Sequence, residues 1–142
     1  MSYNDLRLGR YSQRQQVYHI TTVTRGRQPV FAEWRKGRIV VQNLMTLAKE
    51  GKADTLCYVV MPDHVHWLME LKQGNLADAM QLLKGRCAHH LAGQIWQPGF
   101  HDHALRHEED MAELARYIVA NPLRAGLVKR LGDYPLWDAI WL

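Results

Sequence analysis

Hydrophobic positions along the chain follow two periods. Segments in which apolar and β-branched residues alternate or run together between turn residues predict strands, and apolar residues at every third or fourth position predict helices. The predicted strands are residues 17–24, 55–61, 64–71 and 100–106, and the predicted helices are residues 31–49, 76–91 and 110–121. This β-α-β-β-α-β order with one further helix predicts an α+β protein with a ferredoxin-like sheet. Such a sheet carries its helices on one face, and we expect the other face to be free for a functional site.

The third predicted strand, "HVHWLMEL", has two chemically different faces. Side chains alternate across a strand, so His64 and His66 point to the same side. The residues between and after them are apolar and are expected under the helices: Val65, Trp67, Met69 and Leu71. Two neutral imidazoles that project together can bind one metal ion. The alternative is a pair of ordinary surface histidines, because the chain has eight histidines and a second His-x-His pair at His101 and His103.

The last predicted helix presents a tyrosine and an asparagine in the same direction. Asp110 and Glu113 have the spacing of a capping box, which predicts the helix start, and Pro122 predicts its end at Asn121. Tyr117 lies at the edge of the apolar stripe, and Asn121, four residues later, lies beside it. A phenol is a competent nucleophile towards a phosphodiester if a cation withdraws charge from the phosphate. The alternative is a tyrosine at the boundary of the core and an asparagine that only ends the helix.

Composition adds limits to this picture. The chain has 142 residues, which predicts a single domain over 1–142, with 1–15 as a flexible basic arm and 131–142 as a tail. The net charge of +4 is compatible with a polyanionic partner. Two cysteines argue against a disulfide scaffold, and the amino-terminal residues contain no apolar signal core. A cytoplasmic protein is therefore expected.

Three sequence blocks resemble a known family. "MPDHVHWLMEL" is similar to the histidine–hydrophobic–histidine motif of the small single-tyrosine HUH transposases, and in particular of the REP-associated tyrosine transposases. "WQPGFHDHALR" resembles the block after the second helix of that family, and "YIVANPLRAGLV" resembles its tyrosine helix. The blocks occur in the family's order, and the resemblance extends over about residues 11–137.

The resemblance implies a role for each matched residue. His64 and His66 would be metal ligands, Asn121 the third ligand and Tyr117 the nucleophile. The metal would be Mg²⁺ or Mn²⁺, with no nucleotide or organic cofactor; imidazole ligands suit Mn²⁺ better than Mg²⁺. The substrate would be single-stranded DNA beside an imperfect palindromic hairpin, cleaved and rejoined through a 5′-phosphotyrosine in the bacterial cytoplasm. A monomer is favoured, although a homodimer remains open.

Further residues are candidates for DNA binding or for support of the ligands. Asp63 directly precedes His64 and could orient it from a second shell, or could simply form a turn with Pro62. His103 belongs to the second block, where a structural or DNA-contacting role is expected. Basic side chains could neutralise phosphates, although each by itself could be an ordinary surface charge. The candidates are Arg10, Arg14, Arg27, Arg106 and Arg124.

Two other functions remain open alongside strand transfer. The first is a hairpin-DNA-binding protein without turnover, for which Tyr117→Phe would not affect binding and no metal would yield cleavage products. The second is a metal-dependent nuclease that uses water as the nucleophile and releases free 5′-phosphate. Three tryptophans, Trp96, Trp137 and Trp141, could stack on unpaired bases or belong to the core, and for Trp137 a core or tail-docking role is favoured.

Overall fold

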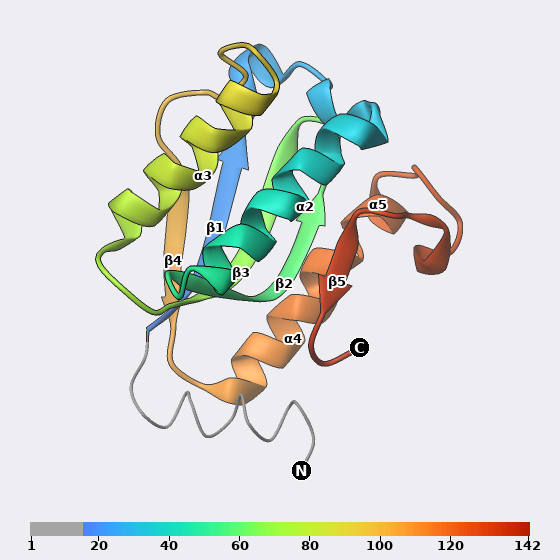
Figure 1. Ribbon diagram of the computed structural model, residues 1–142. Coiled ribbons are helices and arrows are strands. Elements are labelled where there is room, and N and C mark those ends of the chain that lie inside the picture. Colours follow the sequence, from blue (N-terminus) through green and yellow to red (C-terminus); the bar gives the residue numbers. More distant parts are fainter. Residues whose placement is uncertain (1–15) are drawn as a thin grey trace.

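A five-stranded antiparallel sheet forms the centre of the computed structural model, which describes residues 16–142 (Figure 1). The strands lie in the order β4-β1-β3-β2-β5, and every neighbouring pair is antiparallel. Their bounds are β1 Val17–Val23, β2 Ala53–Val60, β3 His64–Leu71, β4 His101–Leu105 and β5 Trp137–Ala139. The first four strands have the ferredoxin-like arrangement that the sequence predicts, so the predicted fold class is confirmed.

A tight hairpin joins β2 to β3. Val60 is paired with Val65, and the Met61 amide donates a hydrogen bond to the His64 carbonyl at 2.8 Å. Pro62 and Asp63 form the turn between the strands, as the short interruption in the apolar pattern predicts. This pairing fixes the register of β3 and therefore the face on which each histidine lies.

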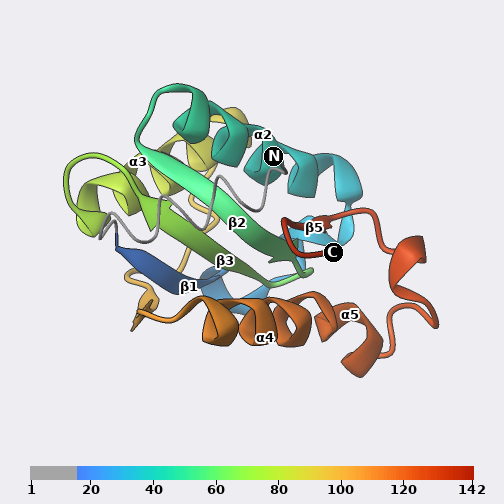
Figure 2. The same ribbon diagram turned by 90° about the horizontal axis from the view of Figure 1, so that it is seen from below.

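Helices cover both faces of the sheet. Figure 2 shows α2 (Trp34–Lys49) and α3 (Leu76–His90) on one face, and α4 (Glu108–Val119) with the short α5 (Asn121–Arg124) on the other. The expectation of a free second face is therefore wrong. The apolar stripe of α4 requires burial, and Met111, Ala115 and Ile118 find it against a cluster that includes Leu56 and Leu68 of the sheet. We call the two sides the α2/α3 face and the α4 face.

Several predicted helix boundaries differ from the observed ones. Residues Val30–Ala32 form a separate 3₁₀ turn before α2. The predicted capping box at Asp110 and Glu113 is wrong, because α4 begins at Glu108, where His107 is the N-cap residue and provides no side-chain hydrogen bond. Two further acidic residues in the first turn favour the earlier start, since negative charge stabilises the positive end of a helix dipole. The chain also continues past Asn121, because Pro122 sits in the first turn of α5, where its missing N–H costs nothing.

The predicted tail contains a fifth strand that the sequence pattern does not reveal. β5 pairs with β2 at the edge of the sheet, with Trp137 opposite Val59. The Tyr134 hydroxyl donates a hydrogen bond to the Val60 carbonyl at 2.6 Å, and the Trp137 indole donates one to the Leu131 carbonyl at 3.1 Å. Trp137 is thus a docking residue rather than a free stacking platform. In the part of the chain that the structure describes, no helix is long and apolar enough to cross a membrane.

Candidate functional site

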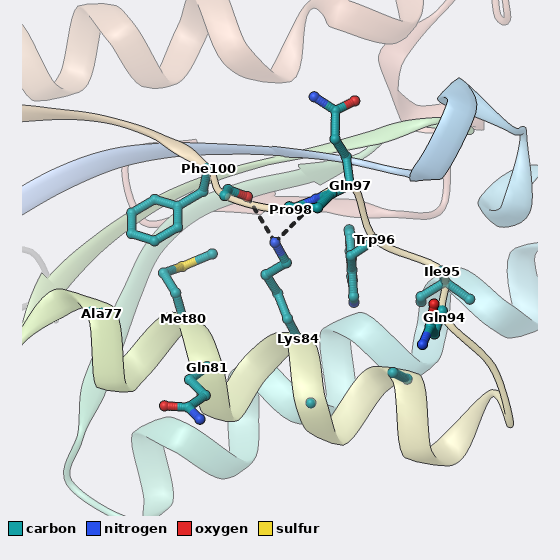
Figure 3. A pocket seen from close by; sticks show the side chains of 13 residues that line it. Ala77, Met80, Gln81, Lys84, Gln94, Ile95, Trp96, Gln97, Pro98 and Phe100 are labelled. Atoms are coloured by element: carbon teal, nitrogen blue, oxygen red, sulfur yellow. Dashed lines mark hydrogen bonds between the residues drawn. The ribbon is translucent and has the colours of Figure 1, made fainter.

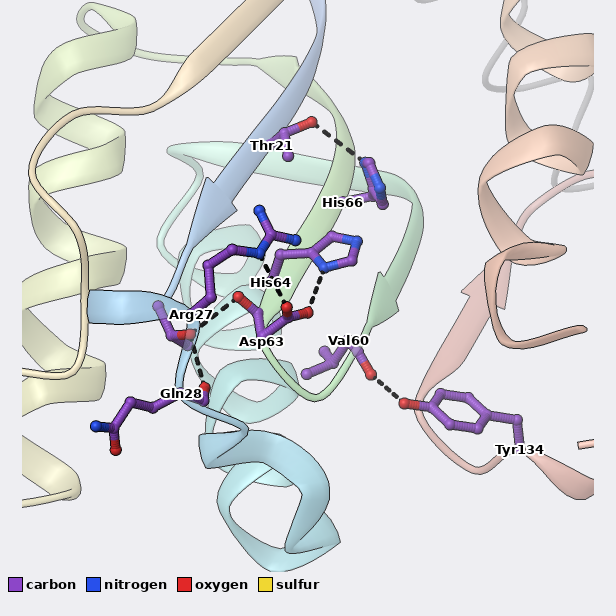
Figure 4. Close-up of polar contacts among 9 residues, drawn as sticks. Thr21, Arg27, Gln28, Val60, Asp63, His64, His66 and Tyr134 are labelled. Atoms are coloured by element: carbon purple, nitrogen blue, oxygen red, sulfur yellow. Dashed lines mark hydrogen bonds and ion pairs between the residues drawn. The ribbon is translucent and has the colours of Figure 1, made fainter. Parts of the chain in front are cut away.

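His64 and His66 lie together at the start of β3, on the α4 face (Figure 4). Their ring centres are 4.9 Å apart and the rings are nearly perpendicular, at 89°. Nδ1 of His64 lies 2.7 Å from the Asp63 carboxylate. Nδ1 of His66 lies 3.0 Å from Nε2 of His19 and 3.2 Å from the Thr21 hydroxyl. Both Nδ1 atoms are thus held by protein groups, and within residues 16–142 neither Nε2 atom has a hydrogen-bond partner.

Asp63 is itself held by Arg27. Nε of Arg27 donates a hydrogen bond to the second carboxylate oxygen of Asp63 at 3.1 Å, so a chain Arg27–Asp63–His64 runs along the end of the sheet (Figure 4). Burial raises the pKa of Asp63. The hydrogen bond from His64 and the nearby positive charges lower it by more, so the net shift of the pKa is downward. Asp63 is therefore ionised and can hold the imidazole in one orientation. Arg27 is a predicted DNA-binding residue. Its side chain pairs with Asp63 within the protein and is 61% exposed to solvent.

His19 and Thr21 were missed by the sequence analysis. They belong to β1, where Thr21 is opposite His66 and His19 is opposite Leu68. The same strand pairs with β4, which places His101 beside Thr21 and His103 beside His19. Cross-strand partners share a face, so five histidines line the α4 face of the sheet. The alternation of "VYHITTV" could have placed His19 and Thr21 on one face, but only the strand register shows that this face is the one with His66.

The environment of His66 keeps its ring neutral. Burial lowers its pKa to about 3, with further lowering by His64, His19 and the positive charge of Arg124. Burial, followed by His103, also lowers the pKa of His19. A neutral imidazole retains a lone pair, which is the form that binds a metal ion or accepts a hydrogen bond.

Tyr117 is presented on the outer side of α4 and is 63% exposed. The guanidinium carbon of Arg124 lies 3.9 Å from the centre of its ring, a cation–π contact that limits the ring's orientations. Arg124 belongs to α5, directly after the bend at Ala120, and its charge also acts on His66. Arg124 thus contacts the tyrosine ring and carries a positive charge that helps to lower the pKa of His66. Among the described residues, none forms a hydrogen bond with the Tyr117 hydroxyl.

Asn121 is suited to supply an oxygen ligand. Its Nδ2 donates a hydrogen bond to the Ile118 carbonyl at 2.7 Å, which identifies the other side-chain atom as the carbonyl oxygen that remains available. Within residues 16–142, no three side chains of the His, Cys, Asp and Glu types form a group suited to a metal ion. Two imidazole nitrogens and one amide oxygen nevertheless form a chemically suitable set for Mn²⁺ or Mg²⁺, with coordination positions left for phosphate oxygens and water. The metal-ligand assignment stays a prediction.

A family model identifies the chain. The model for the IS200-like transposases matches residues 12–121, which include the histidine pair, Tyr117 and Asn121. The chain belongs to the IS200-like transposase family. A REP-associated tyrosine transposase of Escherichia coli strain K12 is 33% identical over 81 residues, which cover 55% of this chain and 49% of that protein. The resemblance found in the sequence is thus confirmed at the level of the family.

A solved structure has the same fold as this IS200-like chain. It is the structure of a REP-associated tyrosine transposase bound to a REP hairpin, with a TM-score of 0.75 and 24% identity. The match covers 87% of this chain and 76% of the other. The chain spans about half the length of the curated relatives it matches, at 49% and 56% of two of them.

The remaining predicted residues are spread around this IS200-like site. His103 is exposed on β4 and lies on the histidine-lined face, where it contributes to lowering the pKa of His19. Arg106 is exposed directly after β4. Arg10 and Arg14 lie outside the described residues. The structure thus brings together the histidine pair, Asp63 and Arg27, and connects Arg124 with Tyr117, whereas the DNA-contacting roles stay predictions.

Proposed function

We propose that this protein cleaves and rejoins single-stranded DNA next to palindromic hairpins through a covalent link to Tyr117. The observation that carries the proposal is the position of Arg124, whose guanidinium contacts the Tyr117 ring while its charge acts on His66. The same side of the sheet carries the two imidazoles, whose Nε2 atoms have no hydrogen-bond partner within residues 16–142, and α4 with its Tyr117; this supports the proposed roles. Membership of the IS200-like transposases supports the same reaction class.

The proposed reaction exchanges one phosphodiester for another. The Tyr117 hydroxyl oxygen attacks the phosphorus, and its proton passes to water. The bond between phosphorus and the 3′-oxygen breaks, and that oxygen takes up a proton as a free 3′-hydroxyl. The product is a 5′-phosphotyrosine, which retains the energy of the broken linkage and permits rejoining when another 3′-hydroxyl attacks it. No high-energy cofactor is required.

The chain's own residues position the reacting groups. His64, His66 and Asn121 would hold a divalent ion, which supplies charge withdrawal from the phosphate when bound. Asp63, with His19 and Thr21, holds the two imidazoles so that their Nε2 atoms remain available. Arg124 restricts the tyrosine ring and offers its guanidinium to a phosphate oxygen.

The DNA substrate and the monomeric state are inferred from separate observations. A structural relative is bound to a REP hairpin, and this chain has a net charge of +4. We therefore expect a hairpin with a single-stranded flank as the substrate. α4 buries its apolar stripe on the sheet of the same chain, which supports delivery of Tyr117 within one molecule and hence a monomer.

The test is a search for the covalent intermediate. The protein is incubated with repeated palindromic DNA from the intergenic regions of its own genome, in Mn²⁺, and separated on a denaturing gel. We expect a protein–DNA adduct that EDTA prevents, that Tyr117→Phe abolishes, and that peptide mapping places on Tyr117. Tyr18→Phe is the matched control, because this half-buried tyrosine packs against the α2/α3 face and should leave the adduct unchanged.

Other outcomes would replace the proposal. Tight hairpin binding without adduct or cleavage in any metal would indicate a binding module. Cleavage that releases free 5′-phosphate without an adduct would indicate a nuclease that uses water. An adduct that persists in Tyr117→Phe would assign the nucleophile to another residue.

A further inference from the structure

A cavity of about 480 Å³ lies between α3 and the segment that leads into β4, on the α2/α3 face and thus away from the histidines (Figure 3). Its walls are Met80 and Lys84 from α3, and Trp96 and Phe100 from the following segment. The volume is in the range of small-ligand sites. A methyl group at Gly85, which also lines the cavity, would meet no atom within 4 Å, so the floor along α3 is open.

Trp96 brings an unused hydrogen-bond donor to this cavity. The residue is only 9% exposed, and Phe31 packs against it with ring centres 5.5 Å apart. Its indole nitrogen points toward α3 (Figure 3), is buried, and has no hydrogen-bond partner among residues 16–142. A buried N–H without an acceptor is costly and rare in folded proteins. An occupant with an acceptor on its edge would satisfy it.

Lys84 contributes a second unused donor. Its ammonium group donates hydrogen bonds to the carbonyls of Gln97 and Gly99, at 2.9 and 2.7 Å, and so fastens the segment to α3. An ammonium group has three protons, which leaves one for an occupant. The side chain is half-buried, and this burial lowers the pKa of Lys84. A planar ring with acceptors on its edge matches both donors and the apolar walls.

The cavity and the histidine site lie at the same end of the sheet. The Thr24 amide donates to the Asp63 carbonyl, and the Arg25 amide donates to the Ile95 carbonyl, both at 2.9 Å. Within the plane of the sheet, the end of β1 thus separates the turn before His64 from Ile95 in the cavity wall by about two strand spacings, or about 10 Å, and a strand would pass round this end of the sheet from one face to the other. Single-stranded DNA is flexible enough to follow such a path. Arg25 and Arg27 lie along the way, exposed on the intervening turn.

We propose that this cavity binds one unpaired base of the DNA substrate, inserted beside Trp96 with its acceptors toward the indole N–H and the Lys84 ammonium. The inference rests on the proposed function only in taking DNA as the substrate. Binding of this base helps to determine which phosphodiester of the DNA strand reaches the histidine site. Stacking of the base on an aromatic ring accepts any base, whereas the two hydrogen-bond donors favour a base with acceptors in matching positions.

The test is a scan with abasic sites. A hairpin with single-stranded flanks is made with each unpaired nucleotide replaced in turn by an abasic one. Binding to the full chain is measured by fluorescence anisotropy without divalent ion, so that no strand is cleaved. We expect one position at which the abasic site weakens binding by about tenfold or more. In Gly85→Leu, which fills the cavity, and in Trp96→Phe, which removes the N–H, this difference should shrink to about twofold or less.

Gly85→Ala is the matched control, because one added methyl meets open space and should leave the full abasic effect in place. Alanine and leucine both raise helix propensity over glycine, so neither variant is expected to unfold. The proposal is overturned if no position is sensitive, or if the sensitive position is equally sensitive in Gly85→Leu and Trp96→Phe. Failure of the proposed function has a different signature, namely an intact abasic effect with no Tyr117 adduct in Mn²⁺.

Discussion

The two faces of the sheet have different roles, and β3 contributes side chains to both. Trp67 and Met69 point to the α2/α3 face, where they join a closed apolar cluster with Leu44 and Leu83. His64 and His66 point to the α4 face, where Met111 and Ile118 of α4 pack on apolar side chains of the sheet. Residues one position apart thus differ completely in environment. The α2/α3 face is packed mainly with apolar side chains, whereas the α4 face also carries several histidines that require hydrogen-bond partners.

The hydrogen-bond partners of the histidines explain how the α4 face remains stable. His66 has its Nδ1 atom bonded to β1 neighbours, and His64 has its own bonded to Asp63. Buried polar groups cost little when they are hydrogen-bonded, so the histidines can be partly buried without destabilising the sheet. Stability of this protein is therefore expected to depend mainly on the α2/α3 face, and activity mainly on the α4 face.

Trp67→Ala should have the largest effect on stability. Trp67 is fully buried and its indole donates a hydrogen bond to Thr55 at 2.8 Å, so its truncation should lower the free energy of unfolding by about 3–5 kcal/mol. Urea denaturation measures this loss. Trp34→Ala is the control, because Trp34 is 49% exposed and should cost less than about 1 kcal/mol. Equal losses at the two positions would contradict the assignment of Trp67 to the stabilising core.

Asp63→Asn should affect the α4 face without affecting the core. The substitution keeps the size of the side chain but removes the charge that orients His64 and pairs with Arg27. Loss of such a supporting carboxylate typically weakens metal affinity or activity by about 10- to 100-fold. Calorimetric Mn²⁺ titration and the rate of adduct formation measure the effect. Asp102→Asn, at an exposed position on β4, should change neither quantity; if both variants behave alike, Asp63 has no positioning role.

Lowering the pH by one unit should produce the smallest effect, and it should act through the α4 face. The pKa of His66 is lowered from 6.5 to about 3 in the folded protein. Between these values the unfolded chain binds a proton that the folded protein does not, so the free energy of unfolding falls as the pH decreases from 6.5 towards 3. The contribution is about 1 kcal/mol per pH unit. Urea denaturation of the metal-free protein at pH 7, 6 and 5 tests this, and His66→Gln should show a shallower decline. Parallel declines would contradict the assignment to His66.

Much of the fold and of the site could be predicted from local sequence patterns. Alternation in "HVHWLMEL" correctly separates the two histidines from the apolar side chains, and the order of elements correctly predicts the ferredoxin-like sheet. Helix boundaries were less predictable. The capping-box spacing at Asp110 and Glu113 is present without forming a cap, because α4 starts two residues earlier, and Trp141 from the distant carboxyl-terminal segment donates a hydrogen bond to Glu108 at 2.9 Å.

The sequence by itself determined which side chains share a strand face and which chemistry they carry, because a period of two is a property of the local backbone. Tertiary structure alone decided that His19 contacts His66, that β5 completes the sheet, and that Arg124 lies against Tyr117. Each of these depends on pairing between residues far apart in the chain or on the bend between α4 and α5. Such contacts form only when the apolar faces on both sides of the sheet are packed, since no local pattern encodes the register of a long-range pair.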